Sequence, residues 1–384
     1  MRIGIDYRPA LVNREGIGRY TRELVRALIA WNLGKDLGLF GYTLGARKYS
    51  DAQLGLQGSP AELVRLRWPS KWMPKLLGAL GKGVDDLVGG AQVFHHTQPS
   101  SLMVRKAVQT ATIFDCIYVG GDRAGYLDER TAQHMTARYK ELVARCRTIL
   151  VPTEFVGAEV VLTLGAHPAH VVVTPLGCDH VVRDGVPTKQ PQAAQPYVLT
   201  VARVDGRKNH VRMLQAFELL VREGLPQRWI VAGPAGHGCQ DFERALERSP
   251  ARARVEWRRD VPDASLPQLY ANADAFLFMS LSEGFGLPPL EAMACGAPVV
   301  SSALTSLPEV LGDAALLVEP TDVDQIFSSL RMLLQDRELA LEMGRRGLAR
   351  ARRFTWQECA KKTLVSWRQA CEPVQEAPRL RRSL

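Results

Sequence analysis

Short apolar runs rich in β-branched residues alternate with segments of helical periodicity along most of the chain. At the start, residues 2–7 have the pattern of a buried strand, and Leu24, Leu28 and Trp31 then recur on one helix face. We expect further strands in the first half at residues 91–95, 110–114, 148–152 and 170–175. Strands that alternate with helices in this way predict parallel sheets covered by helices, and therefore an α/β fold.

The apolar pattern stops between residues 179 and 196, where glycine and proline accumulate at Gly185, Pro187, Pro191 and Pro196. This composition is typical of a linker between domains. A second series of strands is predicted from Tyr197 onward, at residues 229–232, 275–279, 298–301 and 315–318. The sequence therefore predicts two similar domains at 1–178 and 197–353, a C-terminal helix at 354–372 that packs back on the first domain, and a disordered tail at 373–384.

Length and composition are those of an ordinary globular protein. With 384 residues the chain can form two domains that each bury a core. Hydrophobic residues make up 46% and charged residues 23%, which excludes a disordered or fibrous chain. The formal charge of +9 indicates anionic partners, and nucleic acid, phosphorylated small molecules and anionic lipid all fit. The seven cysteines are widely spaced and form no C-x-x-C pair, so we expect reduced, buried thiols.

Targeting and membrane signals are weak. Met1 is followed directly by the strand-like Ile3-Gly4-Ile5, so we expect a cytoplasmic protein without a signal peptide. No apolar run approaches the roughly 20 residues of a spanning helix. A basic, tryptophan-containing segment is a candidate for peripheral contact with anionic membrane, and a solvated surface is the alternative; it contains Arg65, Trp68, Lys71, Trp72, Lys75 and Lys82.

The most informative stretch has two glutamates on either side of a glycine turn, Glu283-Gly-Phe-Gly-Leu-Pro-Pro-Leu-Glu291. Gly284 and Gly286 permit a tight turn after a strand, and Pro288 suits the first turn of a helix that Gly296 ends. Free amides at such a helix start favour a diphosphate. Glu291 can then accept hydrogen bonds from a ribose diol, and Glu283 can hold sugar hydroxyls. The alternative is that the glutamates only favour a helix start and the glycines only build a turn.

Two cations follow another predicted strand in Ala202-Arg203-Val204-Asp205-Gly206-Arg207-Lys208. Arg203 and Lys208 lie at the carboxyl end of the strand, where open α/β sheets bind ligands, so both are candidates to bind phosphate and to stabilise a departing diphosphate. We interpret Arg207 as a solvated surface residue.

Other candidates are less specific. The Gly16-Ile17-Gly18 loop precedes a helix and can present amides to a ligand, and Gly233 follows a strand of the second domain, although both fit simple turns equally well. His95 and His96 end a strand of the first domain, where they can line a cleft on the acceptor side or belong to the core. The single D-x-D string, Asp322-Val-Asp324, is interpreted as a helix cap and not as a metal site.

Together these residues resemble glycosyltransferase family 4, over about residues 1–355. The similar motifs are Gly16-Ile17-Gly18-Arg19-Tyr20, Thr153-Glu154-Phe155, Pro175-Leu176-Gly177-Cys178-Asp179, Arg203 with Lys208, the Glu-x7-Glu pair Glu283 and Glu291, Gly296-Ala297-Pro298-Val299-Val300 and Leu307-Pro308-Glu309-Val310.

The resemblance implies a GT-B fold, in which two Rossmann-like, doubly wound parallel sheets face a cleft. It also implies retaining transfer of a sugar from a nucleotide diphosphate donor to a glycan or lipid-linked acceptor, without metal or cofactor, in polysaccharide synthesis. Arg203 and Lys208 are then expected to bind the donor diphosphate and Glu291 the ribose. Glu283 and the amides of Gly284, Phe285, Gly286 and Leu287 are expected to bind the donor sugar and phosphate.

The sequence departs from the family in two places. Similar members often have Thr-x-His-Asp where this chain has Thr112-Ile113-Phe114-Asp115, and Phe114 cannot bond the sugar 6-hydroxyl as that histidine can. We therefore hypothesise a donor that lacks this hydroxyl, such as a 6-deoxyhexose or a pentose; the alternative is that water or a neighbouring polar group bonds it. Arg259-Asp260-Val261 replaces a usual glycine in a loop that lines the base, which leaves the base open.

Other function classes are compatible with parts of the pattern. A sugar-nucleotide epimerase shares the fold, and a non-catalytic sugar-nucleotide sensor would keep Arg203, Lys208 and Glu291. A nucleic-acid-binding protein is disfavoured, because the aromatic residues show no interleaved basic stripe.

Overall fold

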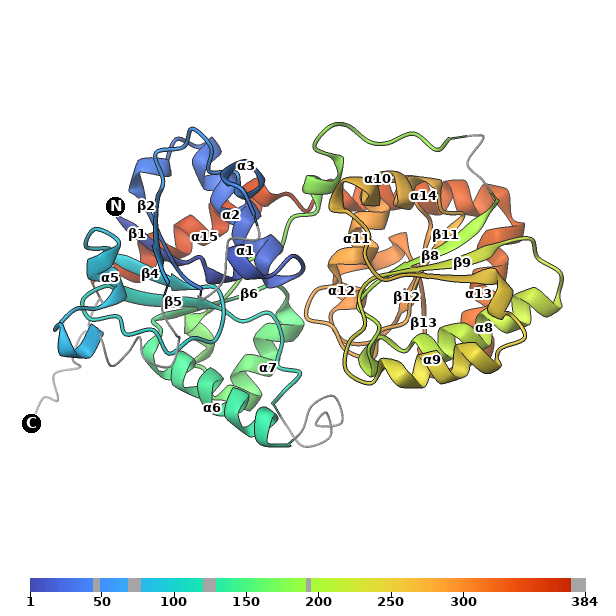
Figure 1. Ribbon diagram of the computed structural model, residues 1–384, viewed down its shortest axis with the longest axis horizontal. Coiled ribbons are helices and arrows are strands. Elements are labelled where there is room, and N and C mark those ends of the chain that lie inside the picture. The colour runs from blue at the N-terminus through green and yellow to red at the C-terminus, as the bar shows by residue number, and fades with distance from the viewer. Residues whose placement is uncertain (44–48, 68–76, 120–128, 191–194, 374–384) are drawn as a thin grey trace, which may run out of the picture.

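The structure is a computed structural model that describes residues 1–43, 49–67, 77–119, 129–190 and 195–373. It consists of two α/β domains that lie side by side, each built on one parallel sheet (Figure 1). The first sheet contains the strands up to residue 173, and the second begins at Tyr197. Two parallel sheets with helices confirm the predicted α/β class.

The first sheet has seven strands in the order β3-β2-β1-β4-β5-β6-β7. The interior strand β1 is buried along its whole length and pairs with β2 and β4. A Cβ atom on Gly4 would lie 2.6 Å from the Phe94 ring, so glycine lets β4 pack closely here. The strands are β1 Ile3–Asp6, β2 Leu37–Tyr42, β3 Glu62–Leu66, β4 Val93–His96, β5 Val108–Thr112, β6 Thr148–Val151 and β7 Val171–Val173.

Helices of the first domain follow the strands they connect. Thr153, for example, accepts a hydrogen bond from the amide of Val156 and thereby caps the N-terminus of α7. The helices are α1 Arg8–Val12, α2 Ile17–Ala30, α3 Asp51–Leu54, α5 Val84–Leu87, α6 Glu129–Arg145 and α7 Glu154–Leu164.

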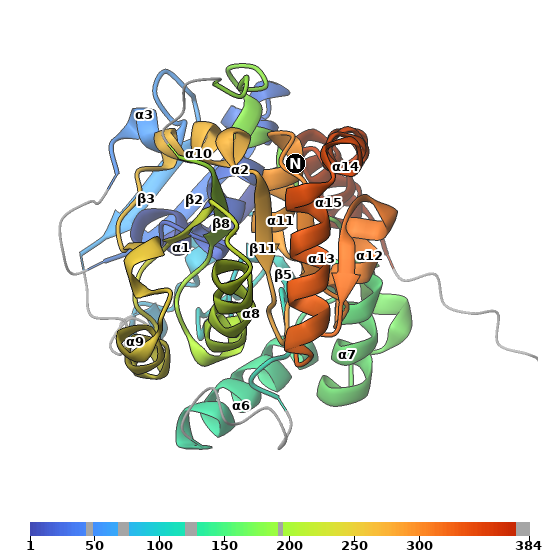
Figure 2. The ribbon, with the colours of Figure 1, turned by 90° about the vertical axis from the view of Figure 1, so that its right-hand side faces the viewer.

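The second sheet has six strands in the order β10-β9-β8-β11-β12-β13. Helices α8 and α13 lie next to each other on its outer side (Figure 2). The strands are β8 Tyr197–Val201, β9 Arg228–Ala232, β10 Val255–Arg258, β11 Ala275–Phe278, β12 Val299–Ser302 and β13 Leu316–Val318. The helices are α8 His210–Arg222, α9 Cys239–Arg248, α10 Leu266–Asn272, α11 Leu287–Ala294, α12 Leu307–Leu311, α13 Val323–Gln335 and α14 Arg337–Ala351.

The chain returns to the first domain in its last helix, α15 Trp356–Cys371. Thr355 caps this helix, which packs on α2 and on β4, β5 and β6 (Figure 1). Where the chain crosses between the domains, the amide of Cys178 donates to the Phe354 carbonyl over 3.0 Å. The amide of Trp356 donates to Asp179 over 2.8 Å. The two crossing segments are therefore hydrogen-bonded to each other.

Several expectations can be compared directly with the structure. Strands β2, β3 and β10 were not predicted. All seven cysteines are free and six are buried, as expected for reduced thiols. Asp322 accepts a hydrogen bond from the amide of Gln325, which confirms its role as the cap of α13.

Two expectations fall outside the described residues. Trp68, Lys71, Trp72 and Lys75 of the candidate lipid-contact segment and residues 374–384 of the predicted tail are not described. Within the part of the chain that is described, no helix is both long and apolar enough to cross a membrane.

Candidate functional site

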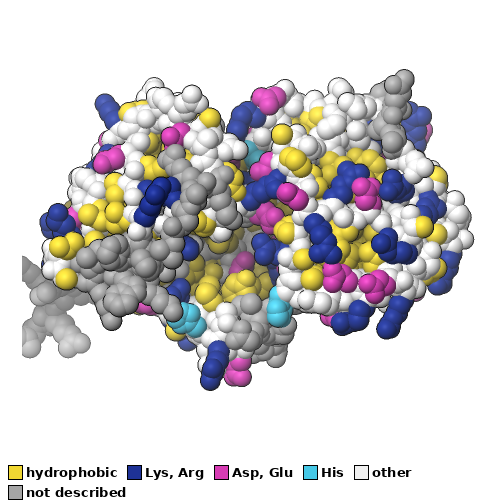
Figure 3. Space-filling model, in the orientation of Figure 1, with side chains coloured by type: hydrophobic (Ala, Val, Ile, Leu, Met, Phe, Trp, Pro, Cys, Tyr) yellow, Lys and Arg dark blue, Asp and Glu magenta, His cyan; other side chains and the backbone are white. Residues whose placement is uncertain are grey.

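A cleft of ≈ 1660 Å³ lies between the two domains and is lined by both. Charged side chains of both signs gather around it (Figure 3). Its walls are mostly loops that follow the carboxyl ends of strands, where a parallel sheet presents its binding surface. Most of the residues that the sequence singled out line this cleft.

The glycine turn before α11 forms part of the cleft wall. Gly286 has φ +88° and precedes the helix, and a Cβ atom on Gly284 would lie 1.7 Å from the Phe114 carbonyl oxygen. Both positions therefore require glycine, one for its conformation and one for close approach to the first domain. Gly284, Phe285, Gly286, Leu287 and Pro288 line the cleft where α11 begins. Pro288 and Pro289 have no N–H, so the backbone amides that this turn can offer a ligand belong to residues 284–287.

Glu283 is held by two cations. Its side chain is 11% exposed, and Oε1 contacts both the Lys208 ammonium and the Arg207 guanidinium, the latter at 3.0 Å. Burial alone would raise the pKa of Glu283, but Lys208 and Arg207 outweigh it and lower the pKa to about 2. Glu283 is therefore a carboxylate, and its charge is neutralised by its neighbours.

The cations are fixed by the loop that carries them. Asp205 accepts a hydrogen bond from the amide of Lys208, and Asn209 has φ +60° and donates through its side chain to the Pro320 carbonyl over 2.7 Å. Arg207 accepts from the amide of Leu281 through its carbonyl and donates to the Ser282 carbonyl over 2.6 Å. Its side chain is 22% exposed. The interpretation of Arg207 as a solvated surface residue is therefore wrong.

Arg203 is arranged differently. Its side chain is 55% exposed, lines the cleft, and lies 3.8 Å from Glu15 of the first domain. It is not bonded to Glu283 or Lys208, so the structure brings the two predicted phosphate ligands to one cleft without joining them in one cluster.

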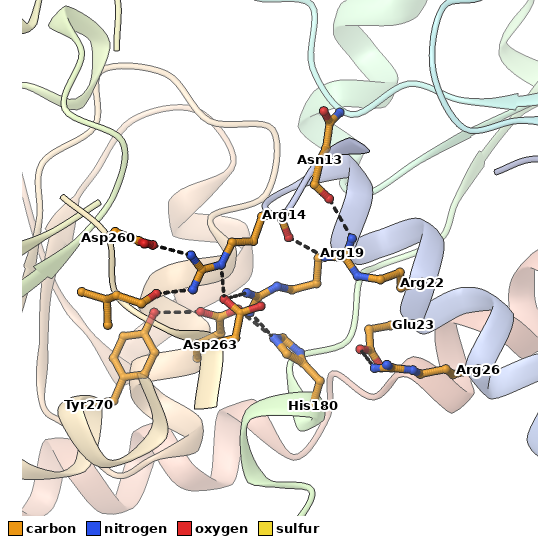
Figure 4. A network of polar contacts seen from close by, with 12 residues as sticks. Asn13, Arg14, Arg19, Arg22, Glu23, Arg26, His180, Asp260, Asp263 and Tyr270 are labelled. Carbon is orange, nitrogen blue, oxygen red and sulfur yellow. Dashed lines mark hydrogen bonds and ion pairs between the residues drawn. The ribbon is translucent and has the colours of Figure 1, made fainter. Parts of the chain in front are cut away.

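Glu291 is the centre of a buried network, and Figure 4 labels three residues that contact it, Arg19, His180 and Tyr270. Its side chain is 4% exposed, and Oε1 accepts from Arg19 of the first domain over 2.9 Å. Oε2 accepts from the hydroxyl of Tyr270 over 2.7 Å. Burial raises the pKa of Glu291, but Arg19 and His180 outweigh it and lower the pKa to about 2. A carboxylate accepts about four hydrogen bonds, so three protein donors leave room for about one ribose hydroxyl.

His180 supplies the third donor to Glu291. Trp356 donates its indole N–H to His180 Nδ1 over 3.1 Å, and an indole can only donate. His180 Nε2 lies 2.9 Å from Glu291 Oε1, to which it donates when it carries the ring proton, and 2.7 Å from Nη1 of Arg19. This chain of contacts links α15, the interdomain crossing and α11.

A second contact joins the domains at the edge of the cleft (Figure 4). Arg14 donates to Asp260 over 2.7 Å and to Asp263 over 3.0 Å, and Arg19 lies 3.3 Å from Asp263. Arg22 donates to the Asn13 carbonyl over 2.7 Å and thereby fixes the loop that carries Arg14. We call Arg14, Arg19, Asp260, Asp263 and Glu291 the interdomain latch.

The motifs at the opposite edge also connect the domains. Thr153 donates to the Gly284 carbonyl over 3.0 Å. The carboxylate of Glu309 accepts from the amides of Glu154 and Phe155 over 2.9 and 3.1 Å, at the start of α7. The motifs at residues 153–155 and 307–310 thus meet in space, because Glu309 of the second domain caps α7 of the first.

The remaining glycines have separate roles. Gly16 has φ +50°, precedes α2 and lines the cleft. Gly18 lies in the first turn of α2, where a Cβ atom would be 2.0 Å from the Asn13 carbonyl oxygen, and it is a packing residue outside the cleft lining. Gly233 has φ +149°, packs against the Ala202 carbonyl and lines the cleft.

Phe114 and Asp115 line the cleft from the first domain. The Phe114 ring packs edge-on against Tyr20, with centroids 4.8 Å apart. Burial raises the pKa of Asp115, against the opposing effect of Arg207.

His95 and His96 do not line the cleft, so their assignment to an acceptor side is wrong. Both are fully buried, and burial lowers the pKa of each to about 3. His95 bonds Thr110 and packs against Trp367 of α15, and His96 bonds Ser100 and Gln109. They are core residues, and burial keeps both rings neutral. Trp367 of the C-terminal helix covers His95.

Four residues of the site were not assigned from the sequence. Arg19 belongs to the motif Gly16-Ile17-Gly18-Arg19-Tyr20, and a cation in a family motif was the signal that could have identified it. Arg207 is adjacent to Lys208 in the sequence, but it was interpreted as a solvated surface residue. His180 and Tyr270 had no local signal, since each joins Glu291 only through the packing of distant segments.

The sequence relatives of the chain are glycosyltransferases. The family described as "Glycosyl transferases group 1" matches residues 187–350. The O-antigen chain mannosyltransferase B of Escherichia coli is 35% identical over 269 residues, which cover 67% of this chain and 68% of that protein. The serotype-specific mannosyltransferase WbdA of Escherichia coli is 33% identical over 184 residues, 47% of this chain but only 22% of WbdA.

Solved structures of low sequence identity share the fold. Sucrose-phosphate synthase from Thermosynechococcus elongatus has a TM-score of 0.72 at 20% identity, over 96% of this chain and 98% of that one. Anabaena HepE in complex with UDP and glucose has a TM-score of 0.73 at 16% identity, over 95% and 100% of the two chains. The architecture is therefore the GT-B fold.

Proposed function

This chain belongs to the group 1 glycosyltransferases, and from that premise we propose that it transfers mannose or a related sugar from a nucleoside diphosphate donor. The proposed acceptor is a hydroxyl of a glycan or lipid-linked glycan in cell-surface polysaccharide synthesis. Two relatives are named as mannosyltransferases, one of them of an O-antigen chain, which supports this choice.

One observation carries the proposal for the site. Arg203, Lys208, Glu283 and the backbone of residues 284–287 line one cleft together with Phe114 of the first domain. Cations and free amides suit a diphosphate, and a buried carboxylate suits sugar hydroxyls. This combination supports donor binding by the second domain.

The proposed chemistry is departure of the diphosphate with attack by an acceptor hydroxyl on the same face, which retains the anomeric configuration. Arg203 and Lys208 stabilise the charge that develops on the leaving diphosphate. Lys208 contacts Glu283 in the structure, so Arg207 would remain to neutralise Glu283 when Lys208 turns to the phosphate. No side chain acts as a nucleophile in this proposal.

The donor sugar depends on Phe114. Mannose carries a 6-hydroxyl, and an unpaired buried hydroxyl costs about 1–3 kcal/mol. A donor without it fits the phenyl ring directly, whereas mannose needs another partner. Rates with GDP-mannose and GDP-6-deoxymannose decide between them; equal or faster use of GDP-mannose overturns the 6-deoxy hypothesis.

Product analysis tests the transferase proposal. Purified protein is incubated with a nucleotide sugar, with and without a mannoside acceptor, and the products are separated and identified. A new glycoside with retained configuration supports transfer. Epimerised or hydrolysed donor independent of acceptor indicates an epimerase or hydrolase, and binding without turnover of any donor indicates a sensor.

A further inference from the structure

Most of the charges that line the cleft are paired with one another. The lining carboxylates of the described residues each have a partner: Glu15 with Arg203, Asp115 near Arg207, Asp205 with the Lys208 amide, Asp241 with Arg244, Asp260 and Asp263 with Arg14, Glu283 with Lys208, and Glu291 with Arg19. Arg259, a lining cation, is paired with Glu243 outside the lining.

Two lining cations, Arg8 and Arg138, have no carboxylate within ion-pair distance among the described residues. Both belong to the first domain, Arg8 at the start of α1 and Arg138 on α6. Arg8 lies over the Tyr42 ring, 5.0 Å from its centroid. Its Nε is buried and has no hydrogen-bond partner, so no protein group satisfies the hydrogen-bonding capacity of this guanidinium group fully.

The two arginines act on the same part of the cleft. Tyr42 lines the cleft together with both of them, and the positive charges of Arg8 and Arg138 both oppose the rise in its pKa that burial and Asp6 cause. Gln98, Ser100 and Ser101 line the cleft beside them and offer neutral polar groups.

The nearest buried acid does not neutralise Arg8. Asp6 is fully buried, and its Oδ1 accepts from the backbone amide of Arg8 and its Oδ2 from Gln98, each over 3.2 Å. Burial raises the pKa of Asp6 to about 6. The Asp6 carboxyl is thus bonded to the Arg8 amide and to Gln98, and although its charge interacts with that of Arg8, it forms no ion pair with the guanidinium group within 4.0 Å.

We propose that Arg8 and Arg138 form an oxyanion subsite for the acceptor, whose phosphoryl or carboxylate group they bind. The subsite lies on the first domain, across the cleft from the residues assigned to the donor. Guanidinium groups match both oxyanions, because their planar N–H donors can bond two oxygens at once. The inference rests on the proposed transferase function, since that function makes this half of the cleft the acceptor half.

Binding of small acceptor analogues tests the subsite without turnover. The protein is saturated with the nucleoside diphosphate that it binds, so that the donor half is occupied, and is titrated calorimetrically with methyl α-mannoside 6-phosphate, methyl α-glucuronide and neutral methyl α-mannoside. We expect at least one anionic probe to bind at least about tenfold tighter than the neutral probe. The anionic probe that binds more tightly shows whether the acceptor carries a phosphoryl or a carboxylate group.

Variants connect this preference to the two arginines. Arg8→Gln and Arg138→Gln should each remove about tenfold or more of the affinity for the anionic probe and leave the neutral probe unchanged. Arg252→Gln, which removes an exposed charge outside the cleft lining, is the matched control and should change neither. Thermal melting of each variant checks that it is folded.

The two proposals can fail separately. Equal binding of neutral and anionic probes, or anionic binding that survives both arginine substitutions, overturns the subsite even if the enzyme transfers sugar. Arginine-dependent anion binding in a protein that forms no glycoside would support the subsite and overturn the transferase proposal.

Discussion

At the scale of single residues, the site consists of carboxylates whose charge depends on cations buried beside them. Glu283 has Lys208 and Arg207, and Glu291 has Arg19, His180 and Tyr270. Arg203 by contrast is half exposed and lies 3.8 Å from Glu15 of the first domain. These residues should therefore differ in whether their loss affects folding, donor binding or both.

Arg207 and Arg203 provide one such contrast. Arg207→Ala leaves Lys208 to neutralise Glu283, so we expect a loss of about 1–3 kcal/mol in unfolding free energy together with weaker donor binding. Arg203→Ala should change stability by less than about 0.5 kcal/mol and still weaken donor binding. Urea denaturation and calorimetric titration of both variants measure the two effects. Equal stability losses would contradict the different roles.

Ionisation gives a second prediction, with opposite signs at two acids. The folded pKa of Glu291 is about 2, below its usual 4.5, so its stabilisation is complete above pH 4.5 and is lost as the pH falls toward 2. The folded pKa of Asp6 is about 6, above its usual 3.8, so its ionisation destabilises the fold above pH 6, and protonation relieves this between pH 6 and 4.

Denaturation of the wild type, Glu291→Gln and Asp6→Asn between pH 3 and 8 measures both effects. As the pH falls below 4.5, Glu291→Gln should lose less unfolding free energy than the wild type loses. Asp6→Asn should lack the gain in unfolding free energy that protonation of Asp6 gives the wild type between pH 6 and 4. Parallel pH curves for all three proteins would show that neither carboxyl group has a shifted pKa.

At the scale of elements, glycines set how closely the domains approach. Gly284→Ala places a methyl group against the Phe114 carbonyl, so the Glu283 turn must move. We expect a loss of activity of about a hundredfold, because small misplacements of reacting groups are costly. Gly157→Ala in α7 meets only ordinary contacts at 3.5 Å and is the control; it should keep activity and stabilise the helix by about 0.5–1 kcal/mol. Activity and melting temperature are compared for the two. Full activity of Gly284→Ala would mean that the turn can tolerate displacement.

The sequence predicts elements better than it predicts their contacts. Strands with buried β-branched runs and the helix after Gly286 follow from local pattern. The strand β2, Leu37–Tyr42, was missed because it contains two glycines, and β3 and β10 because charged residues interrupt their apolar pattern. The burial of His95 depends on α15, whose Trp367 packs against it only after the chain has crossed back from the second domain. His180 and Tyr270 join the site for the same reason of tertiary packing.

At the scale of the whole molecule, the interdomain latch holds together two domains that must also admit substrates. Arg14 pairs with half-exposed to exposed acids, and such pairs contribute at most about 1 kcal/mol. Arg19 and Glu291 are buried, and removing one of them costs about 3–5 kcal/mol. We expect Arg14→Ala to widen the distribution of domain separations while the fold remains stable, and Arg19→Met to reduce stability as well.

Small-angle scattering with and without nucleoside diphosphate measures the separation. The radius of gyration of ligand-free Arg14→Ala should exceed that of the wild type, and the matched surface variant Arg331→Ala should not change it. Identical scattering of Arg14→Ala and the wild type would show that the latch does not control the domains.

The central claim is that the cleft binds the diphosphate of an activated sugar through cations of the second domain. Calorimetric titration of a nucleoside diphosphate into the wild type and into the Arg203→Ala/Lys208→Ala double variant tests it most directly. The account predicts saturable binding to the wild type and a loss of about a hundredfold or more in the folded double variant. Unchanged affinity in the double variant would contradict it.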